Sequence, residues 1–285
     1  MIVLILGSLG FTGRNLCERL RKEQGIEVIG ADCLSDGRDG NYVCDLIDFG
    51  AVMKLLSEVK PDQIYNVAGS ISNNYEECYA SNVVITKNIL DAMESIKLTG
   101  RVLLVGSAAE YGLVSADDLP VKETQTANPV SIYGLTKVYQ SALTRTYRNL
   151  YDQDIVMVRP FNLIGEGISE SLFPGRLQKS IRDLKSGKTK RIKTGSLNAR
   201  RDYIPIDNAL FYYQLVMDKG IAGEAYNVGS GKSILLRDLL RDILSKVGLD
   251  MSIVDEMPVQ EKNKLDVLDI YGDISKLKSL QNNDS

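Results

Sequence analysis

The residues best suited to chemistry are a tyrosine and a lysine four positions apart, Tyr133 and Lys137, in the stretch S-I-Y-G-L-T-K. Residues with this spacing share one face of a helix. An ammonium group beside a phenol favours the phenolate, so we expect Lys137 to lower the pKa of Tyr133. Ser107 follows an apolar run and could hydrogen-bond the same reacting oxygen. This set predicts proton transfer at a substrate hydroxyl, and an exposed helix pair is the alternative interpretation.

The chain contains no histidine. This absence excludes Ser-His-Asp and Cys-His triads, and it excludes histidine as a metal ligand. Proton transfer must therefore use Tyr, Lys, Glu, Asp, Cys or Ser. The four cysteines match no zinc or redox spacing, so we interpret them as reduced thiols and predict no metal site; they are Cys17, Cys33, Cys44 and Cys78.

A glycine-rich stretch, G-S-L-G-F-T-G, occupies residues 7–13 and places glycines at Gly7, Gly10 and Gly13. It follows the apolar run I-V-L-I-L and opens a predicted helix. Glycines in such a turn let a pyrophosphate approach the backbone and the N-terminus of the helix. The spacing is GxxGxxG, and in this context it predicts a dinucleotide site rather than a plain turn.

Acidic residues follow the next two predicted segments. Asp32 ends the second apolar run, about 20 residues past the glycine stretch, where a carboxylate can bind the adenosine ribose hydroxyls and repel a 2′-phosphate. NAD is therefore favoured, and NADP stays possible because Arg14 or Arg38 could meet a phosphate. Asp45 is expected to hold the adenine amino group, with the backbone of Leu46 beside it, and a surface aspartate is the alternative.

The elements that must position these residues alternate between short apolar runs and helical stretches. Apolar runs lie at 2–6, 27–31, 62–68, 101–107 and 154–160, and helices are predicted at about 12–22, 49–58, 75–96 and 132–151. This order predicts a Rossmann-like, doubly wound parallel sheet of the α/β class. We expect an NAD(P)-binding domain over 1–160, rejoined by part of 202–228, and a smaller substrate-binding region mainly over 161–285.

Bulk properties are those of an ordinary globular protein. The chain has 285 residues, 44% of them hydrophobic, and a net charge of −3. The charge balance gives no indication of nucleic-acid binding. No apolar run reaches membrane-spanning length, so we expect a cytoplasmic protein without membrane association.

Six motifs resemble, in order, those of the NAD-dependent epimerase/dehydratase family of extended short-chain dehydrogenases. They are the glycine stretch, NVAG at 66–69, VGSAAEYG at 105–112, YGLTK at 133–137, RPFNLIGEG at 159–167 and RRDYIPIDNA at 200–209. Within that family, the stretches around 193–216 and 225–233 are most similar to GDP-4-keto-6-deoxy-mannose reductases and GDP-mannose 4,6-dehydratases. The resemblance implies a nucleotide-sugar substrate and a catalytic set of Ser107, Tyr133 and Lys137.

The resemblance also implies further binding residues. At the cofactor, beside the residues above, it adds Phe11, Thr12, Ala68 and Asn82, with Tyr133 and Lys137 contacting the nicotinamide end. Asn162 and Arg201 match positions that contact the phosphates of the sugar nucleotide. The helices near 75–96 and 131–151 resemble those that pair in dimeric relatives, where Val83, Val84, Leu90 and Leu143 could supply an apolar face. We therefore expect a homodimer.

Three functions remain open from the sequence. Dehydratases of the family carry an acid where this chain has Ala109, beside Ala108, and alternation in an extended segment would aim Glu110 elsewhere. This disfavours a 4,6-dehydratase. The resemblance favours a 4-keto-6-deoxy-sugar nucleotide reductase, with a nucleotide-sugar 4-epimerase as the alternative and a non-catalytic NAD(P)-binding sensor as a third class.

Overall fold

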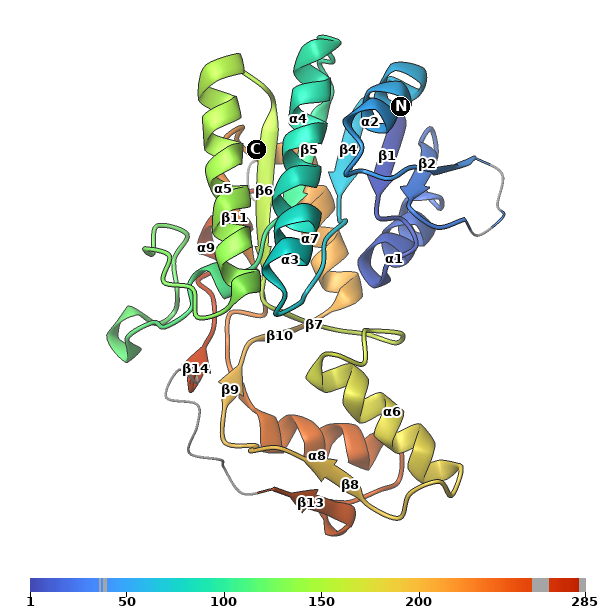
Figure 1. The fold of residues 1–285 in the computed structure, drawn as a ribbon. Coiled ribbons are helices and arrows are strands. Elements are labelled where there is room, and N and C mark those ends of the chain that lie inside the picture. Colours follow the sequence, from blue (N-terminus) through green and yellow to red (C-terminus); the bar gives the residue numbers. More distant parts are fainter. Residues whose placement is uncertain (36, 38–39, 258–266, 282–285) are drawn as a thin grey trace.

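The predicted alternation forms a seven-stranded parallel sheet in the computed structural model, which describes residues 1–35, 37, 40–257 and 267–281. The strand order is β11-β6-β5-β4-β1-β2-β3, so the chain winds outward from β1 in both directions (Figure 1). The strands are β1 (Ile2–Leu6), β2 (Glu27–Asp32), β3 (Asn41–Val43), β4 (Gln63–Asn66), β5 (Arg101–Val105), β6 (Ile155–Pro160) and β11 (Ala225–Val228). This arrangement confirms the predicted Rossmann-like fold class.

Helices cover both faces of the sheet because alternate strand residues point to opposite sides. One core joins one face of the central strands to α1 (Phe11–Leu20), α7 (Ile206–Lys219) and α9 (Ser275–Ser279). The other core joins the opposite face to α2 (Phe49–Val59), α4 (Ile85–Ser95) and α5 (Ile132–Tyr151). All parallel strands end at one edge, so the loops that follow them gather there.

The rest of the chain forms a smaller lobe below that edge (Figure 1). Its own apolar core lies between α6 (Phe173–Lys185) and α8 (Leu236–Lys246). Three small pairings complete it: β7 (Asn162–Ile164) with β10 (Tyr203–Pro205), β8 (Ile192–Thr194) with β13 (Val254–Glu256), and β9 (Arg200–Arg201) with β12 (Ile234–Leu235) and β14 (Asp269–Ile270). β7 directly follows β6, so it carries the chain from the sheet into the lobe.

Two local expectations from the sequence need correction. The helix expected at 75–96 is α3 (Tyr75–Tyr79), a π-helical turn at Ala80–Val84 and then α4. The segment after Ser107 forms a 3-10 turn, Ala108–Glu110, rather than extended chain. The structure also contains the strand β3, whose 3 residues are too few to show a periodic pattern. Arg38 lies outside the described residues.

The described residues contain neither a membrane-spanning helix nor a cluster of metal ligands. No helix among them combines the length and apolar character needed to cross a membrane. Nor do the histidine, cysteine, aspartate and glutamate side chains of that part of the chain gather into a group of three or more that could hold a metal ion.

Candidate active site

The glycine stretch forms a tight turn between β1 and α1 in which the backbone comes very close to its neighbours. Gly7 has a φ of 81°, and a Cβ atom there would lie 2.7 Å from the Cα of Ala68. A Cβ atom on Gly13 would lie 2.1 Å from the carbonyl oxygen of Gly7. Side chains at these positions would collide with backbone, so the turn depends on glycine and leaves the N-terminus of α1 open to an anion.

Asp32 lies at the end of β2, where it contacts the glycine turn. Its Oδ2 accepts a hydrogen bond from the backbone N–H of Leu9 at 2.9 Å. Farther along this edge, Asp45 is exposed and its Oδ1 accepts from the N–H of Ile47 at 3.0 Å. Leu46 is buried, and its carbonyl oxygen accepts from the side chain of Asn88 at 3.0 Å. The structure thus gathers both carboxylates at the edge where the glycine turn lies.

Ser107 begins the turn that follows β5. Its Oγ accepts from the N–H of Ala109 at 3.1 Å, and its own N–H donates to Oε1 of Glu110 at 3.1 Å. These reciprocal bonds form a capping box around the 3-10 turn. The Ser107 side chain is therefore held in place, and its hydroxyl hydrogen remains able to donate to another oxygen.

Glu110 is buried, and its carboxylate is engaged inside the protein. Besides the bond from Ser107, its Oε2 accepts from Nε of Arg159 at 3.0 Å and from Oγ of Ser141 at 2.5 Å. The expectation that Glu110 points away from the reacting centre is met, although the 3-10 turn rather than strand alternation causes it. A carboxylate held by three donors is a poor candidate for an acid or base at the substrate.

Tyr133 and Lys137 lie in the first turns of α5, and the ammonium nitrogen of Lys137 is 5.8 Å from the centre of the Tyr133 ring. Burial raises the pKa of Tyr133 to about 12, and hydrogen bonding with Ser107 offsets part of that rise. Burial also lowers the pKa of Lys137 to about 8. The expected lowering of the tyrosine pKa is therefore wrong for this structure, because loss of hydration outweighs the hydrogen bond with Ser107.

Lys137 is only 4% exposed, and its Nζ donates to the carbonyl oxygen of Val105 at 2.8 Å. Gly69 lies beside it: a Cβ atom there would be 3.5 Å from Nζ and 2.7 Å from Oδ1 of Asn82. The ammonium thus faces a space that only a glycine leaves open. Phe11 and Thr12 begin α1 directly after the glycine turn, and Ala68 lies against Gly7. With Lys137 and Gly69, they fit a dinucleotide lying along the edge of the sheet.

Asn162 and Arg201 come together where the sheet meets the smaller lobe. Asn162 pairs with Tyr203 in register between β7 and β10, and its Nδ2 donates to the carbonyl oxygen of Asp202 at 2.9 Å. Arg201 precedes this pair, and its Nη1 donates to the carbonyl oxygen of Arg200 at 2.8 Å. Buried Asp202 accepts from Ser230 at 2.7 Å and from Gly231 at 3.1 Å through backbone N–H groups, which anchors the segment.

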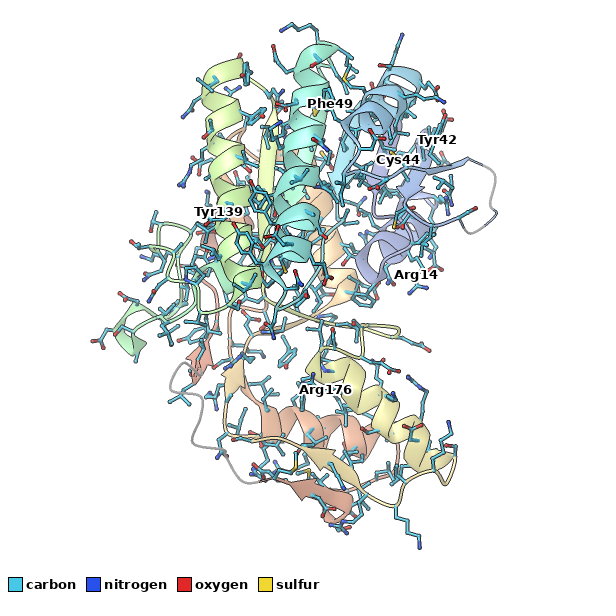
Figure 2. All side chains as sticks on the ribbon, viewed as in Figure 1. Arg14, Tyr42, Cys44, Phe49, Tyr139 and Arg176 are labelled. Atoms are coloured by element: carbon cyan, nitrogen blue, oxygen red, sulfur yellow. The ribbon has the colours of Figure 1, made fainter. Side chains whose placement is uncertain are left out.

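Sequence reasoning missed Arg176, near the start of α6. Figure 2 shows Arg176 at the end of α6 that lies nearest the sheet. Burial raises the pKa of Tyr203 to about 12, and the charges of Arg201 and Arg176 act against that rise, so both guanidinium groups lie near its phenol. The only signal in the sequence is an arginine three residues after Phe173 at the start of a helix, which is too common to single out.

The chain belongs to the NAD dependent epimerase/dehydratase family, whose model matches residues 3–229. That match covers the sheet, the glycine turn and the Tyr133–Lys137 helix. The chain is therefore an enzyme of a family that uses a nicotinamide dinucleotide.

Individual relatives are similar over nearly the whole chain. One is GDP-6-deoxy-D-talose 4-dehydrogenase of Aggregatibacter actinomycetemcomitans, 26% identical over all of this chain and 92% of its own length. Another is UDP-glucose 4-epimerase of Mycolicibacterium smegmatis, 29% identical over 87% of this chain and 83% of its own length. A solved structure of RMD from Pseudomonas aeruginosa, complexed with NADPH, has a TM-score of 0.85 at 22% identity, covering 98% of this chain and 91% of that one.

The position of Asp32 generates a test of cofactor preference. We expect NADH to bind more tightly than NADPH, because the carboxylate repels a 2′-phosphate at the adenosine ribose. Asp32→Asn keeps an oxygen that can accept from Leu9 but removes the charge, so NADPH affinity should rise by roughly tenfold while NADH affinity changes little. Isothermal titration calorimetry with both cofactors measures this. Asp45→Asn is the comparison: because Asp45 is expected to hold the adenine that both cofactors share, it should change both affinities alike. A wild-type protein that prefers NADPH would contradict the assignment.

Proposed function

We propose that this chain is an oxidoreductase acting at C4 of a nucleotide-sugar, and that it reduces a GDP-linked 4-keto-6-deoxy sugar. The proposal rests chiefly on one observation: Ser107, Tyr133 and Lys137 converge beside the glycine turn at the same edge of the sheet. Similarity to a GDP-6-deoxy-D-talose 4-dehydrogenase supports both the GDP group and chemistry at C4. The bound dinucleotide supplies the hydride.

The chain's own residues handle the substrate oxygen and its proton. The Tyr133 phenol donates a proton to the C4 oxygen as the carbonyl is reduced. Ser107 donates a hydrogen bond to the same oxygen and holds it in reach of Tyr133. Lys137 orients the ribose attached to the nicotinamide of the cofactor and provides positive charge near the Tyr133 phenol.

The protonation state of Tyr133 suits a proton donor. A pKa of about 12 keeps the phenol protonated near neutral pH. A neutral phenol can give a proton to a carbonyl oxygen, and the phenolate that remains can accept one from a hydroxyl in the reverse reaction. Dehydration is disfavoured, because Ala109 has no acidic group and Glu110 is held by Arg159.

A nucleotide-sugar 4-epimerase is the second candidate. It would use the same three residues in both directions, oxidising C4 and returning hydride to the other face after the keto sugar rotates. The 29% identity with a UDP-glucose 4-epimerase supports it. No side chain in the described site distinguishes the two reactions.

A panel of nucleotide-sugars distinguishes a reductase from a 4-epimerase. The purified protein is mixed with GDP-, UDP- and dTDP-linked 4-keto and 4-hydroxy sugars, with NADH or NADPH, and the nicotinamide absorbance is followed. A reductase consumes the reduced cofactor stoichiometrically with a 4-keto sugar. An epimerase converts a 4-hydroxy sugar into its C4 epimer, detected by NMR, without net change in cofactor. If no member of the panel reacts, the proposed substrate class is wrong.

Three substitutions test the catalytic set by the order of their effects. Tyr133→Phe removes only the hydroxyl, so kcat should fall by roughly a hundredfold to ten-thousandfold with cofactor affinity nearly unchanged. Lys137→Met should lower both kcat and cofactor affinity, because the lysine serves both. Ser107→Ala should lower kcat less than either of these, since Tyr133 can still donate the proton. Steady-state kinetics and NADH titration give these values, and near-normal turnover in Tyr133→Phe contradicts the assignment.

We infer that 161–285, apart from the part of 202–228 that rejoins the sheet, binds the nucleotide-sugar and that Arg201, Arg176 and Asn162 hold its diphosphate. A guanidinium group can contact a diphosphate through two N–H groups, which lysine cannot imitate. Arg201→Lys and Arg176→Lys should each raise KM by roughly tenfold with a smaller effect on kcat. Arg182→Lys, on the same helix but paired with exposed Glu170, is the matched control. If the substitutions change kcat and leave KM unchanged, the arginines do not hold the diphosphate.

We also propose a homodimer through the outer face of α3 and α5. Leu90 is fully buried within the monomer and does not supply this face, whereas Val83 and Leu143 line the groove on it. Three half-exposed tyrosines also supply this face: the rings of Tyr75 and Tyr79 stack at 5.7 Å, and Tyr139 meets Tyr79 edge-on at 6.5 Å. Figure 2 shows Tyr139 on α5. The three tyrosines line the same groove, which has a volume of about 430 Å³. An exposed aromatic cluster of this kind is typical of an interface.

Light scattering tests the dimer. The wild-type protein should have twice the monomer mass at micromolar concentration, and Tyr139→Glu should be monomeric because it places a charge in the aromatic cluster. Phe211→Glu, on α7 at the opposite face of the sheet and 44% exposed, should leave the dimer intact. A monomeric wild-type protein would remove the proposal.

A further inference from the structure

We propose that Gln140 is a positioning residue that holds the side chain of Lys137 in the orientation needed at the cofactor. The proposal rests on the assignment of Lys137 under the proposed function, and it adds a residue outside the tyrosine–lysine motif. Gln140 lies one turn beyond Lys137 on α5 and is fully buried. Its Oε1 accepts a hydrogen bond from Nζ of Lys137 at 3.0 Å.

The hydrogen bonds of Thr86 decide which end of the Gln140 amide faces Lys137. Thr86 is fully buried, and its hydroxyl donates its single hydrogen to the carbonyl oxygen of Asn82 at 2.9 Å. The oxygen of Thr86 must then accept from its other partner, Nε2 of Gln140, at 2.9 Å. The amide nitrogen is therefore directed to Thr86, and the amide oxygen is left for Lys137.

The same network continues from Asn82 back to the catalytic helix. Asn82 lies in the π-helical turn, and its Nδ2 donates to Oγ1 of Thr136 at 3.0 Å and to the carbonyl oxygen of Ser70 at 3.1 Å. Thr136 in turn donates to the carbonyl oxygen of Tyr133 at 2.9 Å. Each donor along this path meets an acceptor, so the Gln140 amide cannot rotate without leaving buried polar groups unpaired.

This arrangement determines what remains available on Lys137. The ammonium group has three N–H donors. Val105 and Gln140 accept from it at 2.8 Å and 3.0 Å, and both acceptors belong to the interior. The open side lies at Gly69, so a remaining N–H is available to a hydroxyl group of the cofactor there.

Gln140 also supports the charged form of Lys137 without neutralising it. The titratable groups that face the ammonium are Glu110 from the turn after β5, Cys78 from α3 and Tyr133 from α5. Burial lowers the pKa of Lys137 to about 8, and Glu110 and Cys78 act in the opposite direction. A neutral acceptor that is fixed in orientation stabilises the ammonium, so its removal should lower the pKa of Lys137 further.

The experiment measures the dissociation constant of NADH from pH 6 to 10 by fluorescence, which needs no substrate. In the wild-type protein, affinity should fall as the pH rises through a midpoint near 8, because Lys137 loses the charge that strengthens its bond to the cofactor. Gln140→Leu should move that midpoint down by about one pH unit, and Gln140→Glu should move it up by about one unit. Opposite shifts cannot come from a loss of packing alone.

Gln153→Leu is the matched control. Gln153 is also a buried glutamine, but it bonds the carbonyl oxygen of Leu90 at 2.8 Å, away from Lys137, so the midpoint should not move. If Gln140→Leu does not fold, the nearly isosteric Gln140→Glu still tests the proposal by its upward shift. If NADH affinity titrates in the wild-type protein but neither Gln140 variant moves the midpoint, the role of Gln140 is wrong and that of Lys137 stands. A wild-type affinity that does not titrate overturns the assignment of Lys137 as well.

Discussion

The active-site edge of this protein depends on the burial of one ammonium group. Lys137 is almost inaccessible, and a buried charge is costly unless hydrogen-bond acceptors surround it. The carbonyl oxygen of Val105 and the amide of Gln140 provide them, so the end of β5 and the second turn of α5 must lie in a fixed relation. Thr86 and Asn82 extend that requirement to the π-helical turn and α4. The lysine is therefore held through β5, α5, the π-helical turn and α4 together.

A second buried charge organises the neighbouring turn. The carboxylate of Glu110 accepts from Arg159, Ser141 and the backbone of Ser107, so β6, α5 and the turn after β5 share one ion pair. Removing either charged partner of such a pair leaves an uncompensated charge in the interior. Because the backbone N–H of Ser107 donates to Glu110, this ion pair fixes the backbone that carries the Ser107 hydroxyl. The position of the hydroxyl therefore depends on interior packing. The ion pair also keeps the Glu110 carboxylate engaged inside the protein.

Under the proposed function, proton transfer and substrate binding belong to differently built parts of the molecule. Ser107, Tyr133 and Lys137 stand at the edge of a rigid parallel sheet, where neighbouring strands place their loops within reach of one another. Arg201 and Arg176 belong to the short strands and the helix of the smaller lobe, which the buried carboxylate of Asp202 ties to the segment at 227–231. Substrate identity can therefore change through the lobe while proton transfer at the sheet edge stays the same.

The sequence alone determined the features that depend on local spacing. Alternating apolar runs and helices specified the parallel sheet, glycines at 7, 10 and 13 specified the turn, and the four-residue interval specified a shared helix face for Tyr133 and Lys137. The tertiary structure decided the properties that arise when residues far apart in the chain pack together. Burial, rather than the adjacent lysine, sets the pKa of Tyr133, Arg159 engages Glu110, and α6 brings Arg176 toward Arg201. Solvent exclusion and long-range partners exist only once the elements have assembled, so no local pattern encodes them.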